Sequence, residues 1–388
     1  MQNNGFNIGK DEVMIKKIDQ LVIKIIPVII ITLSLSSCVQ ISNKTEEITL
    51  GVAWPFASDT SLFEEGIDMA VEEINEKGGI RGQRLRLLKS DDASETTKGL
   101  AVAQSMSDSE TVMAVIGHKS SYISVPASAI YKEANLVMLS PASTAPELTE
   151  KDQQNIFRII PSDAVLAEKL AEFLADMNHK RIVIYYSDDS YGRGLADAVE
   201  DQFRRYGITI VDRFTEYAGE EELSRLKDRW RAFGYDGIFV AAAISQGGQF
   251  IYDAGQIGIN TVFIGGNALD SSQLSNLIGE QDSSIVIGSV FDPAASEQAK
   301  GFSRNFANKY GMEPDSYAAL GYDAVHILAA ALQNTENNNR EEVAEKLREL
   351  GKWTGVCGVH EFTETGDEAG DLIVIKQLID GSFSRLER

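Results

Sequence analysis

The sequence predicts an α/β protein with two doubly wound parallel-sheet lobes. From residue 48 nearly to the C-terminus, short apolar runs typical of buried strands alternate with amphipathic helical patterns. Such alternation is typical of parallel sheets covered by helices on both faces. The alternation is interrupted at residues 157–161 (FRIIP) and then restarts. The length of 388 residues also exceeds that of one usual domain. We therefore expect two lobes of the same kind.

The first run of elements is expected to begin with a buried strand at residues 48–53. A helical face follows from Leu62 to Ile74, and Gly78 and Gly79 are expected to end that helix. The next expected elements are a strand at 85–88, a helix at 96–107, a strand at 112–116, a helix at 125–133 and a strand at 136–139.

The same alternation continues beyond Pro161. Helices are expected at 164–177, 193–206, 221–233 and 247–254, and strands at 182–185, 209–211, 237–241, 262–264 and 285–290. Three helical patterns follow at 296–310, 317–332 and 340–350. The apolar runs 359–362 and 372–378 flank Gly366 and Asp367, and we expect them to pair as a closing hairpin.

The N-terminus has the pattern of a secretory signal. Lys16 and Lys17 precede a largely apolar stretch at 21–35, which runs into Leu35-Ser36-Ser37-Cys38. The last four residues resemble the bacterial lipobox, which implies that residues 1–37 are removed and Cys38 carries lipid. The alternative is an uncleaved anchor, although the stretch is short for a span of about 20 apolar residues. Residues 38–47 are expected to tether the protein to the outer face of a bacterial membrane, and Met1 or Met14 could be the start.

Composition restricts the partners. The formal net charge is −22, which argues against nucleic acid and against anionic membrane surfaces. If Cys38 carries lipid, the second cysteine, Cys357, has no partner within the chain, and we expect it to be a small buried residue. We expect a monomer.

Two apolar runs end in small hydroxylated residues. The first continues into Gly117-His118-Lys119-Ser120-Ser121, and the second into Ser140-Pro141-Ala142-Ser143-Thr144. Ligands of α/β proteins bind outside the carboxyl ends of parallel strands, where free backbone N–H groups and helix dipoles favour a carboxylate or phosphate. The alternative interpretation is that these residues are ordinary helix N-caps.

Patterns of common catalytic sites are missing from the sequence. It has no Gly-x-Ser-x-Gly, His360-Glu361 lacks the second histidine of a zinc helix, and Tyr191-Gly192-Arg193-Gly194 lacks the third glycine of a dinucleotide site. We therefore expect a protein that is not an enzyme and that uses neither a cofactor nor a metal.

Several longer segments resemble one family. IGHKSSYISVPASAIYKEANLVMLSPASTAPEL (116–148), INEKGGIRGQRLRLLKSDDA (74–93), DDSYGRGLADAV (188–199) and YAALGYDAV (317–325) are similar to the leucine/isoleucine/valine-binding proteins of bacterial ABC importers, which are type I periplasmic binding proteins. The resemblance implies two lobes joined by a three-crossover hinge that close around a ligand. It implies a first lobe of residues 48–160 plus 291–356 and a second of 161–290 plus 357–388.

The resemblance also implies a ligand site. Ser121 matches the family's carboxylate-binding serine, and Ala142 and Thr144 match its backbone and hydroxyl donors. Ser120 and Ser143 lie beside these donors and are included as candidates. Tyr191 matches an aromatic residue that closes over the ligand. Trp54 and Phe56 match a side-chain wall, with plain core packing as the alternative.

Three positions depart from the family pattern. Asn267 stands in the place of the acid that binds the ligand ammonium, Ile244 replaces a tyrosine, and Lys119 replaces an apolar residue. Together they predict a ligand more anionic than an aliphatic amino acid, such as an acidic amino acid, a keto or hydroxy acid, or an amide. Alternatively, Asp270 serves the ammonium and Lys119 points to solvent.

The resulting hypothesis is an extracytoplasmic lipoprotein that binds a small carboxylate-bearing solute for an ABC permease. The alternative is a ligand-sensing receptor subunit of the same fold, which acts with a signalling partner.

Overall fold

The computed structural model describes residues 47–150, 154–279, 285–336 and 339–386. The predicted signal, Cys38 and the tether up to residue 46 lie outside this part of the chain. Within the described part, no helix has the length and apolar character that crossing a membrane requires.

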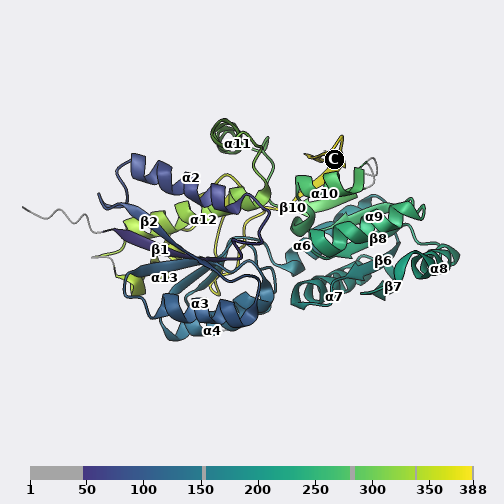
Figure 1. Ribbon diagram of the computed structural model, residues 1–388, viewed down its shortest axis with the longest axis horizontal. Helices are drawn as coiled ribbons and strands as arrows, with labels where there is room; N and C mark the ends of the chain where they lie inside the picture. Colours follow the sequence, from purple (N-terminus) through teal and green to yellow (C-terminus); the bar gives the residue numbers. More distant parts are fainter. Residues whose placement is uncertain (1–46, 151–153, 280–284, 337–338, 387–388) are drawn as a thin grey trace, which may run out of the picture. The chain divides into compact units, whose positions relative to one another are not determined.

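The first sheet is parallel and has five strands in the order β2-β1-β3-β4-β5 (Figure 1). The strands are β1 (Ile48–Trp54), β2 (Leu85–Asp91), β3 (Val112–Gly117), β4 (Val137–Ser140) and β5 (Ile156–Arg158). Its helices are α2 (Phe63–Glu76), α3 (Thr96–Ser107), α4 (Ser121–Glu133), α5 (Glu147–Glu150), α11 (Glu297–Tyr310), α12 (Ser316–Gln333) and α13 (Val343–Glu349). Strands β1, β3 and β4 are buried along their whole length, as continuous apolar runs predict for a covered parallel sheet.

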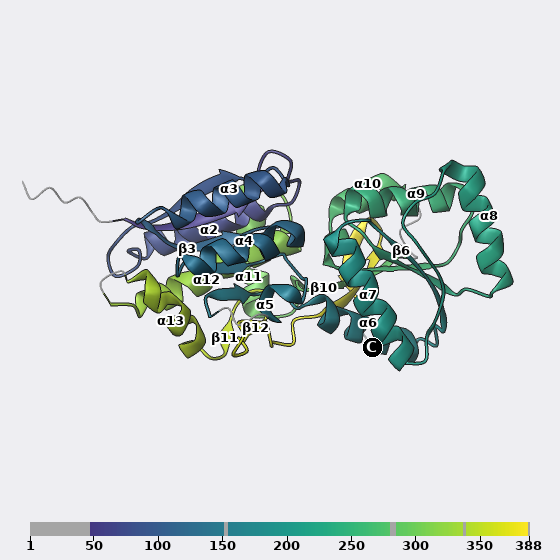
Figure 2. The ribbon, with the colours of Figure 1, turned by 90° about the horizontal axis from the view of Figure 1, so that it is seen from below.

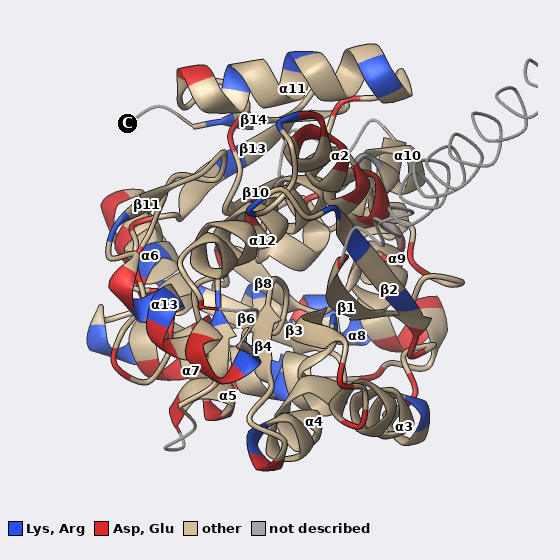
Figure 3. Cartoon of the chain, turned by 90° about the vertical axis from the view of Figure 1, so that its left-hand side faces the viewer, with Lys and Arg blue, Asp and Glu red and all other residues tan. Residues whose placement is uncertain are grey.

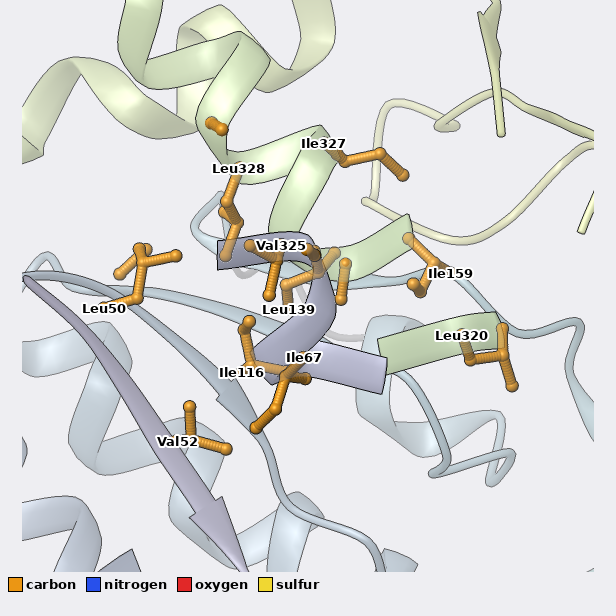
Figure 4. Packing of buried hydrophobic residues seen from close by; sticks show 14 of the residues in the cluster. Leu50, Val52, Ile67, Ile116, Leu139, Ile159, Leu320, Val325, Ile327 and Leu328 are labelled. Atoms are coloured by element: carbon orange, nitrogen blue, oxygen red, sulfur yellow. The ribbon is translucent and has the colours of Figure 1, made fainter. Parts of the chain in front are cut away.

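Helices cover both faces of this sheet. Side chains of α2, α11, α12 and α13 form one core cluster with the sheet, and α3 and α4 form another. Figure 4 shows part of the first cluster, in which Ile116 of β3 lies near Ile67 of α2 and Leu139 of β4 lies near Val325 of α12. Acidic residues gather along α2, where Lys and Arg are missing (Figure 3).

The second sheet has seven strands in the order β14-β13-β10-β9-β8-β6-β7; Figure 2 labels β6 and β10 among them. The strands are β6 (Arg181–Tyr186), β7 (Thr209–Phe214), β8 (Gly237–Ala241), β9 (Val262–Gly265), β10 (Ile285–Ser289), β13 (Val374–Ile379) and β14 (Ser382–Arg385). Helices α6 (Asp163–Asp176) and α7 (Ser190–Arg205) pack on one face. Helices α8 (Gly219–Ala232), α9 (Gln249–Gln256) and α10 (Ser272–Ile278) pack on the other.

The chain passes between the two sheets three times. It leaves the first sheet after β5, returns after β10 and leaves again before β13. These passages confirm the predicted three-crossover fold with two doubly wound lobes.

The predicted closing hairpin is wrong. Strand β12 (Val359–His360) pairs with β11 (Trp353–Thr354), and β13 pairs with β14. Asp380 and Gly381, both with positive φ, form the tight turn between β13 and β14. An Asp-Gly pair between apolar runs is a strong hairpin signal. The turn around Gly366 also forms, but it brings Phe362 to Glu368 and not to the run 372–378.

The predicted lobe boundaries stay a prediction, with one change at the third crossover. Cys357 and Leu372 belong to the core of the first sheet, so we propose that the first lobe extends to about residue 372. This segment is held by Asp323 of α12, which accepts bonds from the backbone N–H groups of Val356 and Cys357, each at 2.9 Å. Cys357 is buried as expected.

His360 strengthens the same attachment. Its two ring nitrogens contact Asp323 at 3.2 Å and Glu368 at 2.6 Å. Burial lowers the pKa of His360, but the hydrogen bonds and charges of Asp323 and Glu368 outweigh this effect and raise the pKa to about 9. The third crossover is therefore fastened to α12 by a buried charged cluster.

Substitution of Gly66 tests the close contact between α2 and α12. A Cβ atom at Gly66 would lie 2.2 Å from the carbonyl oxygen of Ala318, so Gly66→Ala is expected to reduce the free energy of unfolding by about 1–3 kcal/mol. Gly301→Ala in α11 is the matched control, because nothing lies within 4 Å of its Cβ position. It should be neutral or stabilising by up to about 1 kcal/mol. Equal effects of the two substitutions in urea unfolding would contradict the close contact.

Candidate functional site

Loops from both sheets meet at the carboxyl ends of the parallel strands. In the first sheet these loops follow β1, β3 and β4, and in the second they follow β6, β8 and β9. Such strand ends are where α/β proteins bind ligands. Helices α4 and α7, which begin immediately after two of these loops, contact each other.

A cavity of about 380 Å³ lies among these loops. This volume is within the range of small-molecule sites. Side chains from both sheets line it: Pro55, Ser58, Asp59, Ser94, Lys119, Ser120, Ser121, Tyr122, Ala142, Asp189, Tyr191, Ala243, Ser245, Gln246, Ala268 and Tyr317. A larger groove of about 820 Å³ lies along the crossovers and β13–β14. We take the smaller cavity as the candidate site because the strand ends surround it.

Ser120, Ser121 and Ala142 all line the cavity, as predicted. Helix α4 begins at Ser121, four residues earlier than expected, which places Ser121 at the positive end of the helix dipole. The Ser121 Oγ accepts a bond from the Ala145 backbone N–H at 3.4 Å. Its own hydroxyl hydrogen has no acceptor within the described part of the chain and can be donated to a ligand.

Ser143 points into the protein and does not line the cavity. It is fully buried, and its hydroxyl donates to the His118 carbonyl oxygen at 3.2 Å and lies 2.5 Å from the Ser124 hydroxyl. Ser143 therefore ties the loop after β4 to the loop after β3. We interpret it as a positioning residue, which corrects the prediction of a direct ligand contact.

The buried side chain of His118 anchors the loop after β3 to the protein core. Its Nδ1 lies 2.7 Å from an Asp92 carboxylate oxygen and its Nε2 lies 3.1 Å from the Tyr131 hydroxyl, and all three residues are fully buried. The Ser124 hydroxyl oxygen also lies 3.2 Å from the His118 carbonyl oxygen, and it shares a hydrogen bond with Ser143. The backbone from His118 to Ser121 is consequently held by buried side chains on both sides.

Tyr191 lines the cavity from the second sheet, in the first turn of α7. The Asp189 carboxylate caps this helix by accepting the Gly192 backbone N–H at 2.9 Å. Desolvation by burial raises the pKa of Tyr191 well above its usual value, and the Asp163 charge adds to the shift. The phenol is therefore neutral and can donate a hydrogen bond.

The predicted wall residues Trp54 and Phe56 do not line the cavity. Trp54 is fully buried, and its ring stacks on Phe63 at a centroid distance of 3.7 Å. Phe56 packs against the first core with the Lys89 ammonium 5.9 Å from its ring centre. Core packing, the stated alternative, describes both residues, and Pro55 and Asp59 of the same loop line the cavity instead.

Ile244 and Asn267 do not line the cavity either, although residues next to them in the sequence do. Ile244 packs against the second core, while Ala243 and Ser245 line the cavity. Asn267 is buried, its amide nitrogen has no partner among the described residues, and its neighbour Ala268 lines the cavity.

Asp270 is already paired. Its carboxylate receives the Lys376 ammonium at 2.8 Å and the Ser289 hydroxyl, and both charged groups are buried. The alternative in which Asp270 serves a ligand ammonium would require this buried pair to break. Leaving Lys376 uncompensated is costly, so Asp270 is wrong as an amine partner in this conformation.

Lys119 lines the cavity and points at Asp59. Its ammonium lies 2.5 Å from the Asp59 Oδ1 and 5.0 Å from the centre of the Tyr317 ring. Burial of Asp59 opposes ionisation, but the Lys119 charge and the hydrogen bonds from Lys119, Ser61 and Trp54 lower the pKa of this carboxyl overall. The predicted shift of the cavity toward positive charge is therefore wrong, because the cation is neutralised.

Asp163 is a candidate that the sequence did not single out. This fully buried carboxylate lies at the start of α6, directly after the first crossover, and neither of its oxygens has a hydrogen-bond partner among the described residues. Burial raises its pKa to about 7, against smaller lowering effects of Thr144 and Arg158. The Thr144 hydroxyl is also buried without a hydrogen-bond partner among the described residues. Neither Asp163 nor Thr144 is among the residues that line the cavity, but each lies close to one that does: the Asp163 charge acts on Tyr191, and Thr144 follows Ala142 by two residues.

No sequence signal distinguished Asp163 from an ordinary acidic residue in a helix's first turn. The segment Pro161-Ser162-Asp163 has the pattern of a helix start, which is common at the surface. Its burial beside Thr144 depends on the crossover, where the Asp163 backbone N–H donates to the Thr144 carbonyl oxygen at 3.0 Å.

Two helix-covered sheets with a cavity at the carboxyl ends of their parallel strands are the architecture of a two-lobed ligand-binding protein. A model of the periplasmic binding protein family matches residues 47–379. The chain belongs to this family, as a type I member of its branched-chain amino acid group.

Individual relatives agree with this assignment. An amino acid binding protein of Pseudomonas aeruginosa is 27% identical over 366 residues, which cover 92% of this chain and 97% of the relative. An ABC transporter substrate-binding protein of Desulfitobacterium hafniense, solved in complex with Leu, is 49% identical with a TM-score of 0.82, covering 88% of this chain and 100% of that one. The leucine-binding protein LivK of Thermotoga maritima is 26% identical with a TM-score of 0.79, covering 88% and 98%.

Ser143→Ala tests whether this residue positions the loops. Loss of its hydroxyl leaves the His118 carbonyl oxygen with one donor fewer, so the free energy of unfolding without ligand is expected to fall by about 1–2 kcal/mol. Ser120→Ala, at the half-exposed cavity wall, is the matched control and should change stability by less than about 0.5 kcal/mol. If Ser143→Ala leaves the ligand-free protein equally stable, Ser143 does not link the loops.

Proposed function

We propose that the protein is an extracytoplasmic substrate-binding lipoprotein that delivers a branched-chain amino acid, with leucine as the first candidate, to an ABC permease. The observation that carries the choice of ligand is the buried carboxylate of Asp163, which has no hydrogen-bond partner among the described residues. Family membership and the relative solved with Leu support the same class of ligand.

The ligand carboxylate is proposed to bind at Ser121, Ala142 and Thr144. Ser121 offers a free hydroxyl hydrogen at the start of α4, and the unpartnered Thr144 hydroxyl lies two residues beyond Ala142. These donors are neutral and already held in place, so they can match one carboxylate at little reorganisation cost. The dipole of α4 adds favourable interaction with the anion.

The ligand ammonium is proposed to approach Asp163 and Tyr191. An isolated buried carboxylate is unfavourable, and an ammonium with its three donors would satisfy it. A neutral Tyr191 hydroxyl beside Asp163 can accept a further bond from the same group. In this assignment Asp163 takes the role of the acid that the family has at the position of Asn267. We therefore propose an ordinary amino acid as the ligand, and not the more anionic ligand that the sequence predicts.

The cellular context of the proposal comes from the N-terminus and the family. Lipid on Cys38 would keep the protein at the outer face of a bacterial membrane, where it would work as a monomer beside its permease. We propose no catalytic activity and no cofactor, because binding and release complete the task of such a protein.

Calorimetric titration of purified protein, refolded after removal of bound solute, tests this proposal. Leucine, isoleucine or valine should bind, and the keto acid of leucine, which lacks the ammonium, should bind at least about tenfold more weakly. Ser121→Ala should weaken leucine binding by about tenfold to a hundredfold, the usual cost of one hydrogen bond to a charged group. Stronger binding of the keto acid than of leucine would contradict the amino-acid assignment.

Asp163 should make ligand binding depend on pH. Its pKa is about 7 without ligand, and a bound ammonium lowers it, so binding below pH 7 releases a proton and leucine affinity should rise toward pH 7 and then level off. Titration in two buffers of different ionisation enthalpy at pH 6 measures the released proton.

Asp163→Asn is the control for this linkage. It should remove the proton release and weaken leucine binding. It should also stabilise the ligand-free protein at pH 8. The unfolded chain releases the Asp163 proton near pH 3.8 and the folded protein only near pH 7, so the cost of this carboxyl grows between these values and is fully present at pH 8. Unchanged proton release in the variant would show that Asp163 is not the group involved.

A further inference from the structure

Asp59 and Lys119 form an ion pair on the cavity wall. Both residues line the cavity, with a nitrogen–oxygen distance of 2.5 Å. The Asp59 side chain is only 6% exposed and the Lys119 side chain 28% exposed. The pair lies next to Ser120 and Ser121, where the ligand carboxylate is proposed to bind.

Asp59 is fixed by more than its cation. Its Oδ2 accepts the Trp54 indole N–H and the Ser61 hydroxyl, each at 2.5 Å, and its Oδ1 accepts the Ser61 backbone N–H at 3.2 Å. The lysine is confined as well, because its ammonium lies over the rings of Tyr317 and Trp54 at 5.0 and 5.7 Å. Neither charge can leave the other without losing several contacts.

Among the described residues, the charged groups that line the cavity leave no free cation for an additional anionic group, so the cavity is suited to a zwitterion with one carboxylate and one ammonium. Asp59 and Lys119 cancel, and the remaining lining acid, Asp189, is engaged as the cap of α7. The neutral donors near Ser121 match one carboxylate, and Asp163 matches one ammonium. A second carboxylate on the ligand would meet only a lysine that Asp59 already neutralises.

We propose that Asp59 and Lys119 form a specificity-determining pair, in which Asp59 neutralises the lysine beside the carboxylate site and thereby excludes amino acids with an anionic side chain. This inference rests on the proposed amino-acid binding. Without Asp59, Lys119 would supply a free cation close to the bound ligand, and such a cation favours a second carboxylate. Without Lys119, Asp59 would supply a free anion and would favour a cationic side chain.

Titrations of leucine, glutamate and lysine against four proteins test the pair. The natural protein should bind leucine in preference to both charged amino acids. Asp59→Asn should shift the ratio of glutamate to leucine affinity toward glutamate by at least about tenfold. Lys119→Met should shift preference toward lysine instead, and the double variant should return to the preference for leucine.

Two features of the design separate the proposal from general damage to the protein. Asp68→Asn is the matched control, because Asp68 also pairs with a lysine, Lys89 at 2.7 Å, but does not line the cavity. It should leave all three affinities unchanged. Opposite shifts in the two single variants cannot come from loss of stability, which would weaken all ligands together.

The results that overturn the proposal differ from those that overturn the function. If the natural protein binds no amino acid, the proposed function fails, and the role of the pair fails with it. If it binds leucine but Asp59→Asn and Lys119→Met leave the three affinities in the same order, the pair is only structural. If Asp59→Asn does not fold, the shift of Lys119→Met toward lysine, measured against the unchanged Asp68→Asn control, decides the question.

Discussion

The candidate site depends on the buried bond between His118 and Asp92. This bond, 2.7 Å long in the core beneath the strand ends, holds the backbone that leads from β3 into α4. The Ser124 and Ser143 hydroxyls lie 2.5 Å apart and each 3.2 Å from the His118 carbonyl oxygen, so the loop after β4 is tied to the same point. The donors at Ser121 and Ala142 are therefore placed before any ligand arrives, which is the condition for selective binding of a small anion.

Each half of the site has a different physical character. The first sheet contributes neutral donors at the start of α4 and in the loop after β4, supported by bonds within the core. The first crossover contributes Asp163, a carboxylate that burial leaves only partly ionised near neutral pH, because desolvation outweighs the opposing effects of Thr144 and the Arg158 charge. The first set has the chemistry to bind a carboxylate and the second the chemistry to bind an ammonium. We therefore propose that the first half is in place before the ligand arrives, whereas the charged form of Asp163 becomes favourable only with the ammonium beside it.

Much of the fold could be predicted from the sequence, because its strands are continuous apolar runs and its helices carry clear apolar faces. The strand 237–241 and the helix 96–107 were predicted with the bounds that the structure gives them. The strand ends that carry Ser121 and Ala142 were placed correctly for the same reason. The pairing of β13 with β14 was missed because the sequence prediction paired residues 372–378 with the apolar run 359–362. The true partner, β14, follows directly after the Asp380-Gly381 turn. Asp163, the Asp59–Lys119 pair and the burial of Trp54 depend on contacts between distant segments, which the local pattern does not specify.

We infer that the loops after β3 and β4 bind the carboxylate of an amino acid while Asp163 receives its ammonium. A crystal structure of the protein with bound leucine tests this binding mode. We expect the leucine carboxylate to lie within hydrogen-bond distance of Ser121 and the backbone N–H of Ala142 or Thr144, and the ammonium within hydrogen-bond distance of Asp163. Leucine bound in the opposite orientation, or outside the cavity that Ser121 and Tyr191 line, would contradict it.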